Sequence, residues 1–314
     1  MKLPELKIGT KVAKVPIVQG GMAIRLSTAR LAASVAESGG IGLIAASGMT
    51  MEELRHEIRL ARSLTSGVIG INAMVAARVF SDLVKTAISE GIDLIVAGAG
   101  FSRDMFGLGK ESNTPIVPIV SSVKLAKISQ SLGASAVIVE GKEAGGHLGT
   151  DQSVKSLIPG IRKAVDIPVI AAGGVMSGKD IVDLIKLGAN GVQMGTRFAA
   201  SEESNAAPAL KEFYLKAKAE DVVVINSPVG LPGRAVRNPF AEKIMAGKSS
   251  IDSCDSCLKH CKHNFCIIKA LIRAQQGDVE NGLVFTGEYI HKIEEILSVK
   301  EIFARLQAEA DAIN

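Results

Sequence analysis

The chain has 314 residues, of which 47% are hydrophobic, enough to bury a large core in one domain or two. Its 36 basic and 32 acidic residues are interleaved and leave a net charge of +4, and only 4% of the residues are aromatic. This composition excludes the basic face and the base-stacking platforms of a nucleic-acid-binding protein. We therefore expect a small-molecule ligand and no nucleic acid.

The segment 1–7 carries charged residues where a signal peptide has an apolar core. No later apolar run approaches the roughly 20 residues that a helix needs to cross a bilayer. We therefore expect a cytoplasmic protein without a membrane partner.

Short apolar runs alternate with amphipathic segments along the first 200 residues, a pattern that is typical of α/β proteins. The runs that predict strands are 16–18, 41–46, 68–75, 93–97, 115–120, 136–140, 168–172 and 191–194. The helical patterns between them are 27–37, 51–64, 78–89, 122–132, 153–165 and 180–187. Eight strands in about 200 residues predict a closed (β/α)₈ TIM barrel. A doubly wound open sheet is the alternative, and both the count of eight and the glycines after nearly every strand argue against it.

After Phe198 the pattern changes, with helical stretches at 208–219, 267–276 and 289–307, a short strand at 222–225, and a turn-rich segment between. We expect a barrel domain over 1–200. Residues 201–314 are expected to form a helical, cysteine-containing extension packed on the barrel mouth, because so short a tail is not a stable domain by itself.

The most distinctive stretch follows the sixth predicted strand and reads Glu-Gly-Lys-Glu-Ala-Gly-Gly-His-Leu-Gly over 140–149. Four glycines in ten residues let a flat ligand approach the main chain beside His147. A neutral imidazole exchanges protons near pH 7, so His147 is the candidate catalytic residue. The alternative is a histidine that only closes a turn through a backbone bond.

Two residue pairs that contain glycine stand at the ends of the seventh and eighth predicted strands, Gly173-Gly174 and Gly195-Thr196. In TIM barrels these two loops commonly hold a phosphate on exposed backbone N–H groups. Turns that need a positive φ would explain either pair alone. Together the two pairs favour a phosphorylated cofactor.

Amide side chains stand at the ends of the first, third and eighth predicted strands: Gln19, Asn72 and Gln193. Facing the barrel mouth, they would hydrogen-bond the heteroatoms of a bound ring. Capping of their own turns is the alternative for Gln19 and Asn72.

Taken together, Gln19-Gly20-Gly21-Met22, Gly98-Ala99-Gly100, the 140–149 stretch, Ala171 to Gly174 and the segment Gln193 to Phe198 resemble the nitronate monooxygenase family. That superfamily also contains the flavin-dependent enoyl-acyl-carrier-protein reductase II. The resemblance implies non-covalent FMN, a homodimer and His147 as the proton-transfer residue. The residues that it implies for the cofactor are Gln19, Gly20, Gly21, Met22, Asn72, Glu140, Gly145, Gly146, Ala172, Gly173, Gly174, Gln193, Gly195 and Thr196.

The resemblance leaves two reactions open. In the first, an alkyl nitronate is oxidised to a carbonyl compound and nitrite. In the second, NAD(P)H is the co-substrate, and a 2-enoyl thioester is reduced. The sequence carries no Gly-x-Gly-x-x-Gly dinucleotide fingerprint after a strand, but a barrel flavoenzyme does not need one.

All four cysteines, Cys254, Cys257, Cys261 and Cys266, fall within one 13-residue window. Four thiols so close together in a cytosolic chain predict a metal site rather than a disulfide framework. The compact spacing favours a 4Fe–4S cluster, with zinc second. Free structural thiols or an adventitious disulfide are the alternatives. Four thiols already suffice as ligands, so we expect His260 and His263 to be solvated.

Overall fold

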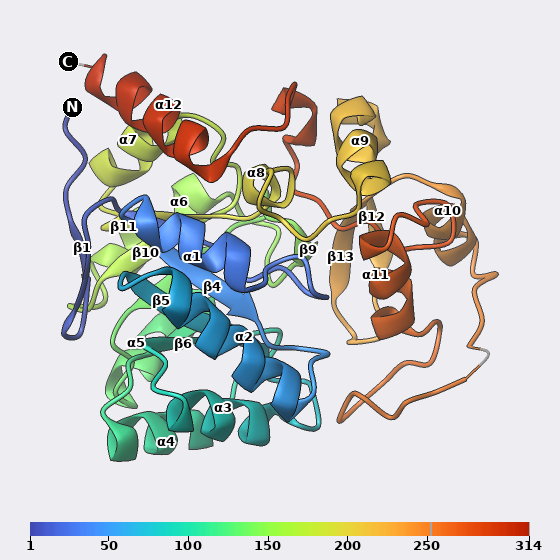
Figure 1. Cartoon of the computed structure of the whole chain (residues 1–314), viewed down its shortest axis with the longest axis horizontal. Helices are drawn as coiled ribbons and strands as arrows, with labels where there is room; N and C mark the ends of the chain where they lie inside the picture. The colour runs from blue at the N-terminus through green and yellow to red at the C-terminus, as the bar shows by residue number, and fades with distance from the viewer. Residues whose placement is uncertain (252, 314) are drawn as a thin grey trace.

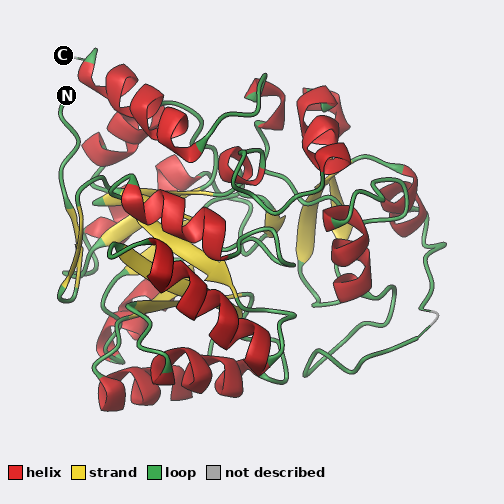
Figure 2. Ribbon diagram, viewed as in Figure 1, coloured by secondary structure: helices red, strands yellow, loops and turns green. Residues whose placement is uncertain are grey.

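A computed structural model describes residues 1–251 and 253–313. Its centre is a closed barrel of eight parallel strands in the order β10-β11-β3-β4-β5-β6-β7-β8 (Figures 1 and 2), which confirms the predicted (β/α)₈ barrel. The barrel strands are β3 (Ile17–Gln19), β4 (Ile41–Ala45), β5 (Val68–Met74), β6 (Leu94–Gly98), β7 (Ile116–Val120), β8 (Val137–Glu140), β10 (Val169–Ala172) and β11 (Gly191–Met194).

Helices surround this barrel, as expected for parallel strands that need crossover connections. They are α1 (Ala29–Glu37), α2 (Met51–Leu64), α3 (Phe80–Ser89), α4 (Asp104–Ser112), α5 (Val123–Ser131), α6 (Val154–Arg162), α7 (Gly178–Lys186) and the short α8 (Thr196–Ala199). Two of the starts are capping boxes, Thr50 with Glu53 on α2 and Ser177 with Asp180 on α7.

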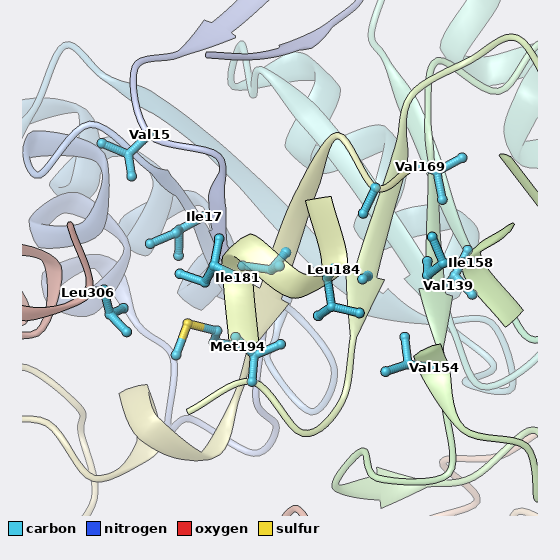
Figure 3. Close-up of a cluster of buried hydrophobic side chains, with 14 of the residues drawn as sticks. Val15, Ile17, Val139, Val154, Ile158, Val169, Ile181, Leu184, Met194 and Leu306 are labelled. Carbon is cyan, nitrogen blue, oxygen red and sulfur yellow. The ribbon is translucent and has the colours of Figure 1, made fainter. Parts of the chain in front are cut away.

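The strands alternate strictly between two apolar layers, which is what the two-residue period of a strand requires. On β8 and β10, Ile138 and Ile170 belong to the cluster inside the barrel, whereas Val139 and Val169 face the helices. Figure 3 shows part of the outer cluster, where Val139 and Val169 lie near Ile158 of α6. The amino end of the barrel is closed by a hairpin of β1 (Leu6–Ile8) and β2 (Lys11–Ala13), whose apolar residues join the inner cluster.

Helix α4 is absent from the predicted elements because its sequence has weak helical character, with glycines at 107 and 109. Gly109 is needed for packing, since a Cβ there would lie 2.3 Å from Ile116 Cγ1 on β7. Asn113, with φ 53°, ends the helix in the left-handed region.

The tail contains α9 (Pro208–Lys216), β12 (Val222–Asn226), β13 (Pro232–Val236), α10 (Pro239–Met245), α11 (Ile267–Gln275) and α12 (Val299–Asp311). Figure 1 shows α9, α10 and α11 grouped beside β12 and β13 on one side of the barrel, whereas α12 returns to lie along α7. The predicted helix over 289–307 is wrong at its start. Only a 3₁₀ turn over Ile290–Lys292 forms there, and α12 begins at Val299, where Ser298 is the N-cap of a capping box with Glu301. Within the described residues, no helix has the length and apolar character needed to cross a membrane.

Candidate active site

A pocket of about 270 Å³ opens at the carboxyl ends of the barrel strands. Fourteen of the fifteen catalytic and cofactor residues predicted from the sequence line it: Gly20, Gly21, Met22, Asn72, Glu140, Gly145, Gly146, His147, Ala172, Gly173, Gly174, Gln193, Gly195 and Thr196. They come from the ends of five of the eight barrel strands, β3, β5, β8, β10 and β11, or from the loops that follow them. The barrel therefore gathers into one cavity residues that are up to 176 positions apart, from Gly20 to Thr196.

Gln19 is the exception. Strand β3 alternates, so Gln19 shares a face with Ile17 of the outer cluster, and the side chain points away from the pocket. It is fully buried, donates a hydrogen bond to Ser27 Oγ (2.9 Å) and accepts one from Leu43 N (3.0 Å). By the same two-residue period, Asn72, Ala172 and Gln193 lie on the inner face of their strands, and all three line the pocket.

The glycines leave main chain open to the cavity. Among the described residues, a Cβ on Gly195 would meet only the Met22 side chain, with Sδ at 3.8 Å and Cγ at 4.0 Å. At Gly173, with φ 110°, a Cβ would lie 2.9 Å from Ala144 N, so only glycine fits this strand end. Gln193 Oε1 is buried and has no hydrogen-bond partner among the described residues. Open backbone at the ends of β10 and β11, beside an unsatisfied amide, fits a ligand that carries both a phosphate and a polar ring.

His147 is held by the tail rather than by the barrel. It lies on β9 (Gly146–His147), which pairs with β13 so that His147 stands opposite Gly233. Its Nε2 lies 2.8 Å from Ser227 Oγ, and its ring meets the Phe285 ring edge-on at 5.3 Å between centroids. Burial lowers the pKa of His147 to about 4, so the imidazole is neutral at pH 7.

Glu140 ends β8 on the inner face of the barrel. Burial raises the pKa of this carboxyl to about 8, so at pH 7 it is mostly protonated. The pocket therefore holds a neutral acid and a neutral imidazole.

The tail supplies a second wall that the sequence analysis missed: Tyr214, Ile267, Ile268, Leu271, Phe285, Thr286, Gly287, Glu288, Tyr289 and Ile290. Gly287 N donates a hydrogen bond to Thr196 Oγ1 (2.9 Å), which joins this wall to the end of β11. Arg234 Nη1 lies 3.0 Å from Glu288 Oε2. The only sequence signal for this wall is the segment 285–289, in which two aromatic residues flank Thr-Gly-Glu. The segment shows neither helical nor strand periodicity.

The four-cysteine segment lies behind this wall. Its main chain pairs with the loop after β5, through Arg78 N to Cys257 O (3.0 Å) and Lys259 N to Ala76 O (2.9 Å). Cys254 is exposed and the other three cysteines are partly buried, all as free thiols. Among the residues with described positions, no group of three or more His, Cys, Asp or Glu side chains is placed to hold a metal ion.

Comparisons with known proteins match this architecture. The profile of the nitronate monooxygenase family matches residues 5–90 and 76–309. Over 274 residues the chain is 32% identical to a probable nitronate monooxygenase of Staphylococcus aureus (strain MSSA476), covering 73% of this chain and 77% of that protein. Over 235 residues it is 34% identical to (3aS,4S,5R,7aS)-5-hydroxy-7a-methyl-1-oxo-octahydro-1H-indene-4-carboxyl-CoA dehydrogenase of Mycobacterium tuberculosis (strain ATCC 25618 / H37Rv). That match covers 74% of this chain and 66% of the relative, slightly under two thirds of the relative's length.

Among solved structures, FabK from Thermotoga maritima superposes with a TM-score of 0.84 at 35% sequence identity, covering 95% of this chain and 93% of that one. The family profile spans the barrel, the histidine loop and most of the tail. The chain therefore belongs to the nitronate monooxygenase family and is an oxidoreductase.

Proposed function

We propose that the protein is an FMN-dependent oxidoreductase that oxidises alkyl nitronates to carbonyl compounds and nitrite. The cofactor phosphate would be held by the loops of Gly173-Gly174 and Gly195-Thr196, and Asn72 and Gln193 would hydrogen-bond its ring system. When bound, FMN supplies the electron-accepting centre that no amino-acid side chain provides. Gln19 supports the barrel from outside the pocket and is left out of this set.

The observation that carries the proposal is the placement of His147. Its imidazole lines the same cavity as the glycine-containing loops after β10 and β11, on a strand that pairs with β13 of the tail. A buried imidazole that is neutral at pH 7 brings no charge into the pocket before the substrate binds, and it is the kind of group that exchanges a proton with a substrate. The family profile and the staphylococcal relatives favour a nitronate as that substrate.

The test is aerobic turnover of propyl-2-nitronate, measured as nitrite released. We expect the flavin-loaded protein to form nitrite, and His147→Ala to lower kcat/KM by about 10²- to 10⁴-fold, the usual contribution of a proton-transfer residue. His291→Ala is the matched control, because His291 is exposed on the 3₁₀ turn of the tail. Wild-type protein that forms no nitrite, or a His147→Ala variant with full activity, would contradict the proposal.

Reduction of an enoyl thioester by NAD(P)H is the second candidate. The specific observation behind it is the likeness to FabK, an enoyl-acyl-carrier-protein reductase II, which extends through the tail and not only the barrel. Consumption of NADH or NADPH that depends on a 2-enoyl thioester would favour this reaction, and equal consumption without the thioester would count against it.

A metal at Cys254, Cys257, Cys261 and Cys266 stays a prediction, with a 4Fe–4S cluster ahead of zinc. Two backbone N–H groups point at sulfur, Ser256 N to Cys254 Sγ and His263 N to Cys261 Sγ, both at 3.4 Å. Such donors stabilise thiolate ligands. The visible spectrum of protein purified without air, with iron, sulfide and zinc analysis, decides between cluster, zinc and free thiols.

The resemblance also implies a homodimer, and we propose that the protein assembles as one. Light scattering on the eluting peak of a sizing column measures this directly. A mass of about twice 32.8 kDa is expected, and a monomer mass at micromolar concentration would contradict it.

A further inference from the structure

His147 and Ser227 form a buried pair, of which the proposed reaction does not yet use Ser227. Ser227 follows β12 and is 3% exposed, and its Oγ lies 2.8 Å from His147 Nε2. His147 Nδ1 has no protein hydrogen-bond partner among residues 1–251 and 253–313, and the imidazole lines the pocket. One ring nitrogen therefore contacts the protein, and the other is left for a ligand.

The hydrogen-bond partners of Ser227 identify the tautomer of His147. A hydroxyl has one proton to donate and two lone pairs. One lone pair of Ser227 Oγ accepts Val229 N–H at 3.3 Å. Within the described part of the chain, the acceptor in reach of the Ser227 proton is His147 Nε2. A buried hydroxyl donates its proton where an acceptor is available, which leaves Nε2 as the acceptor and places the imidazole proton on Nδ1.

We propose that Ser227 is a positioning residue that holds His147 in the tautomer with its proton on Nδ1, and that this N–H binds an oxygen atom of the substrate. The proposal deepens the proposed function and rests on it for the identity of the substrate. The ligand class that fits is one that arrives with an acceptor oxygen, such as the nitronate anion or a thioester carbonyl.

The surrounding structure keeps both partners in place. The Phe285 ring stands at 72° to the imidazole and limits its rotation, and Leu148 N donates to Pro232 O (2.9 Å), which fixes the β9–β13 register. The turn that carries Ser227 is tied on itself, through Ser227 N to Leu231 O (3.0 Å).

The four-cysteine segment holds the same turn from outside. Lys262 N donates to Pro228 O (2.9 Å), and Asn264 Nδ2 donates to Asn226 O (2.7 Å), so residues on both sides of Ser227 are anchored. A hydroxyl at 227 is therefore presented to His147 at a fixed position and not from a free loop.

This arrangement distinguishes two substrates that differ by one proton, the nitronate anion and the neutral nitroalkane. A nitronate presents an anionic oxygen to Nδ1–H at once. A neutral nitroalkane must first lose a proton from carbon, and in this tautomer the nitrogen that faces the pocket has no lone pair to take it. We expect the protein to use propyl-2-nitronate in preference to 2-nitropropane.

The direct test is ¹⁵N NMR of histidine-labelled, flavin-loaded protein at pH 7, with the His147 signals assigned by their loss in His147→Gln. We expect a protonated Nδ1 and an unprotonated Nε2 in wild type and in Ser227→Thr, which keeps the hydroxyl. Ser227→Ala should lose this fixed tautomer. A protonated Nε2 in wild type, or an unchanged pattern in Ser227→Ala, would overturn the proposal.

Steady-state kinetics provide a second test of the proposal. Ser227→Ala should raise KM for propyl-2-nitronate by roughly two- to ten-fold, the value of one hydrogen bond, with a smaller change in kcat. Ser227→Thr should restore KM, and Ser204→Ala, at a buried serine outside the pocket, is the control. If no nitronate is oxidised, the proposed function fails, and the NMR result still decides the tautomer by itself.

Discussion

Glu140 and His147 line one pocket with pKa values displaced in opposite directions by the same cause, burial of a group that is charged in water. Each is therefore neutral at pH 7 in the folded chain, and each lowers stability over the pH range in which the unfolded chain ionises the group and the folded chain does not. The two ranges overlap, but the stability changes have opposite pH slopes, so a variant at each position measures them separately.

For Glu140 the pKa in the folded chain, about 8, lies above the ordinary value of 4.5. The folded state holds the extra proton, so the free energy of unfolding falls as the pH rises from 4.5 through 8, by at most about 5 kcal/mol. We expect Glu140→Gln to lose less stability over this range than wild type in flavin-free protein. Urea unfolding at pH 5 and pH 9 is the measurement, and parallel losses in both proteins would contradict the raised pKa.

For His147 the folded pKa, about 4, lies below the ordinary value of 6.5. The unfolded state takes up the proton first, so stability falls as the pH drops from 6.5 through 4, by at most about 3 kcal/mol. His147→Gln should be less sensitive to acid than wild type. The same urea series, run between pH 7 and pH 4, measures this difference, and His56→Gln, at an exposed position on α2, should behave like wild type.

At the scale of single elements, the turn after β10 is built for close approach of a ligand to the main chain. Gly173→Ala places a Cβ 2.9 Å from Ala144 N and forces alanine to φ 110°. We expect a loss of roughly 2 kcal/mol in stability and at least about ten-fold weaker FMN binding, because the phosphate loop must shift.

Gly133→Ala is the matched control for that change. Gly133 has φ 96°, but a Cβ there meets no atom of the described residues within 4 Å. This variant should lose stability through the strained backbone angle but keep its affinity for FMN. Flavin fluorescence titration measures that affinity. Equal FMN affinity in the two variants would show that the turn after β10 does not bind the cofactor.

The barrel elements were largely predictable because their signal is local. Apolar runs and capping boxes are read within one turn or one strand, and the glycines that end strands mark the side where a ligand binds. Gln19 is the residue for which this reasoning failed. Its place at a strand end suggested that it lines the pocket, but the two-residue period of the strand places its side chain on the outer face of the barrel. Counting that period from Ile17 would have found the difference.

The elements that hold His147 were not predictable in the same way. Strand β9 has two residues and exists through pairing with β13, 86 positions away when His147 is matched to Gly233. Ser227 sits in a turn whose sequence, Ser-Pro-Val-Gly, indicates a bend but not a partner. Contacts between segments so distant are set by tertiary packing, and no short-range pattern records them.

At the scale of the whole molecule, the tail completes both the pocket and the barrel. The amino group of Met1 donates to Ala310 O (2.6 Å) on α12, and Gly178 N on α7 donates to Glu309 Oε2 (2.6 Å). Figure 1 shows the two termini side by side at this corner. The chain ends are thus joined on the helix layer around the barrel.

We therefore expect residues 1–200 without the tail to lose the flavin site. The truncated chain would expose Phe198, which packs on Phe303 of α12 with ring centroids 5.9 Å apart, and would lack the wall that carries Phe285. Full-length protein should unfold in one calorimetric transition and bind FMN. A truncated barrel that binds FMN with full affinity would contradict this account of the tail.

The central claim is that a nitronate gives its electrons to flavin in this pocket. The most direct measurement is anaerobic stopped-flow mixing of the flavin-loaded protein with propyl-2-nitronate, and separately with NADH and NADPH, followed by flavin absorbance. We predict that the nitronate reduces the flavin at least as fast as aerobic turnover and that His147→Ala slows this step. Flavin that stays oxidised with nitronate but is reduced rapidly by NADH or NADPH would contradict the claim and favour the enoyl-thioester reductase.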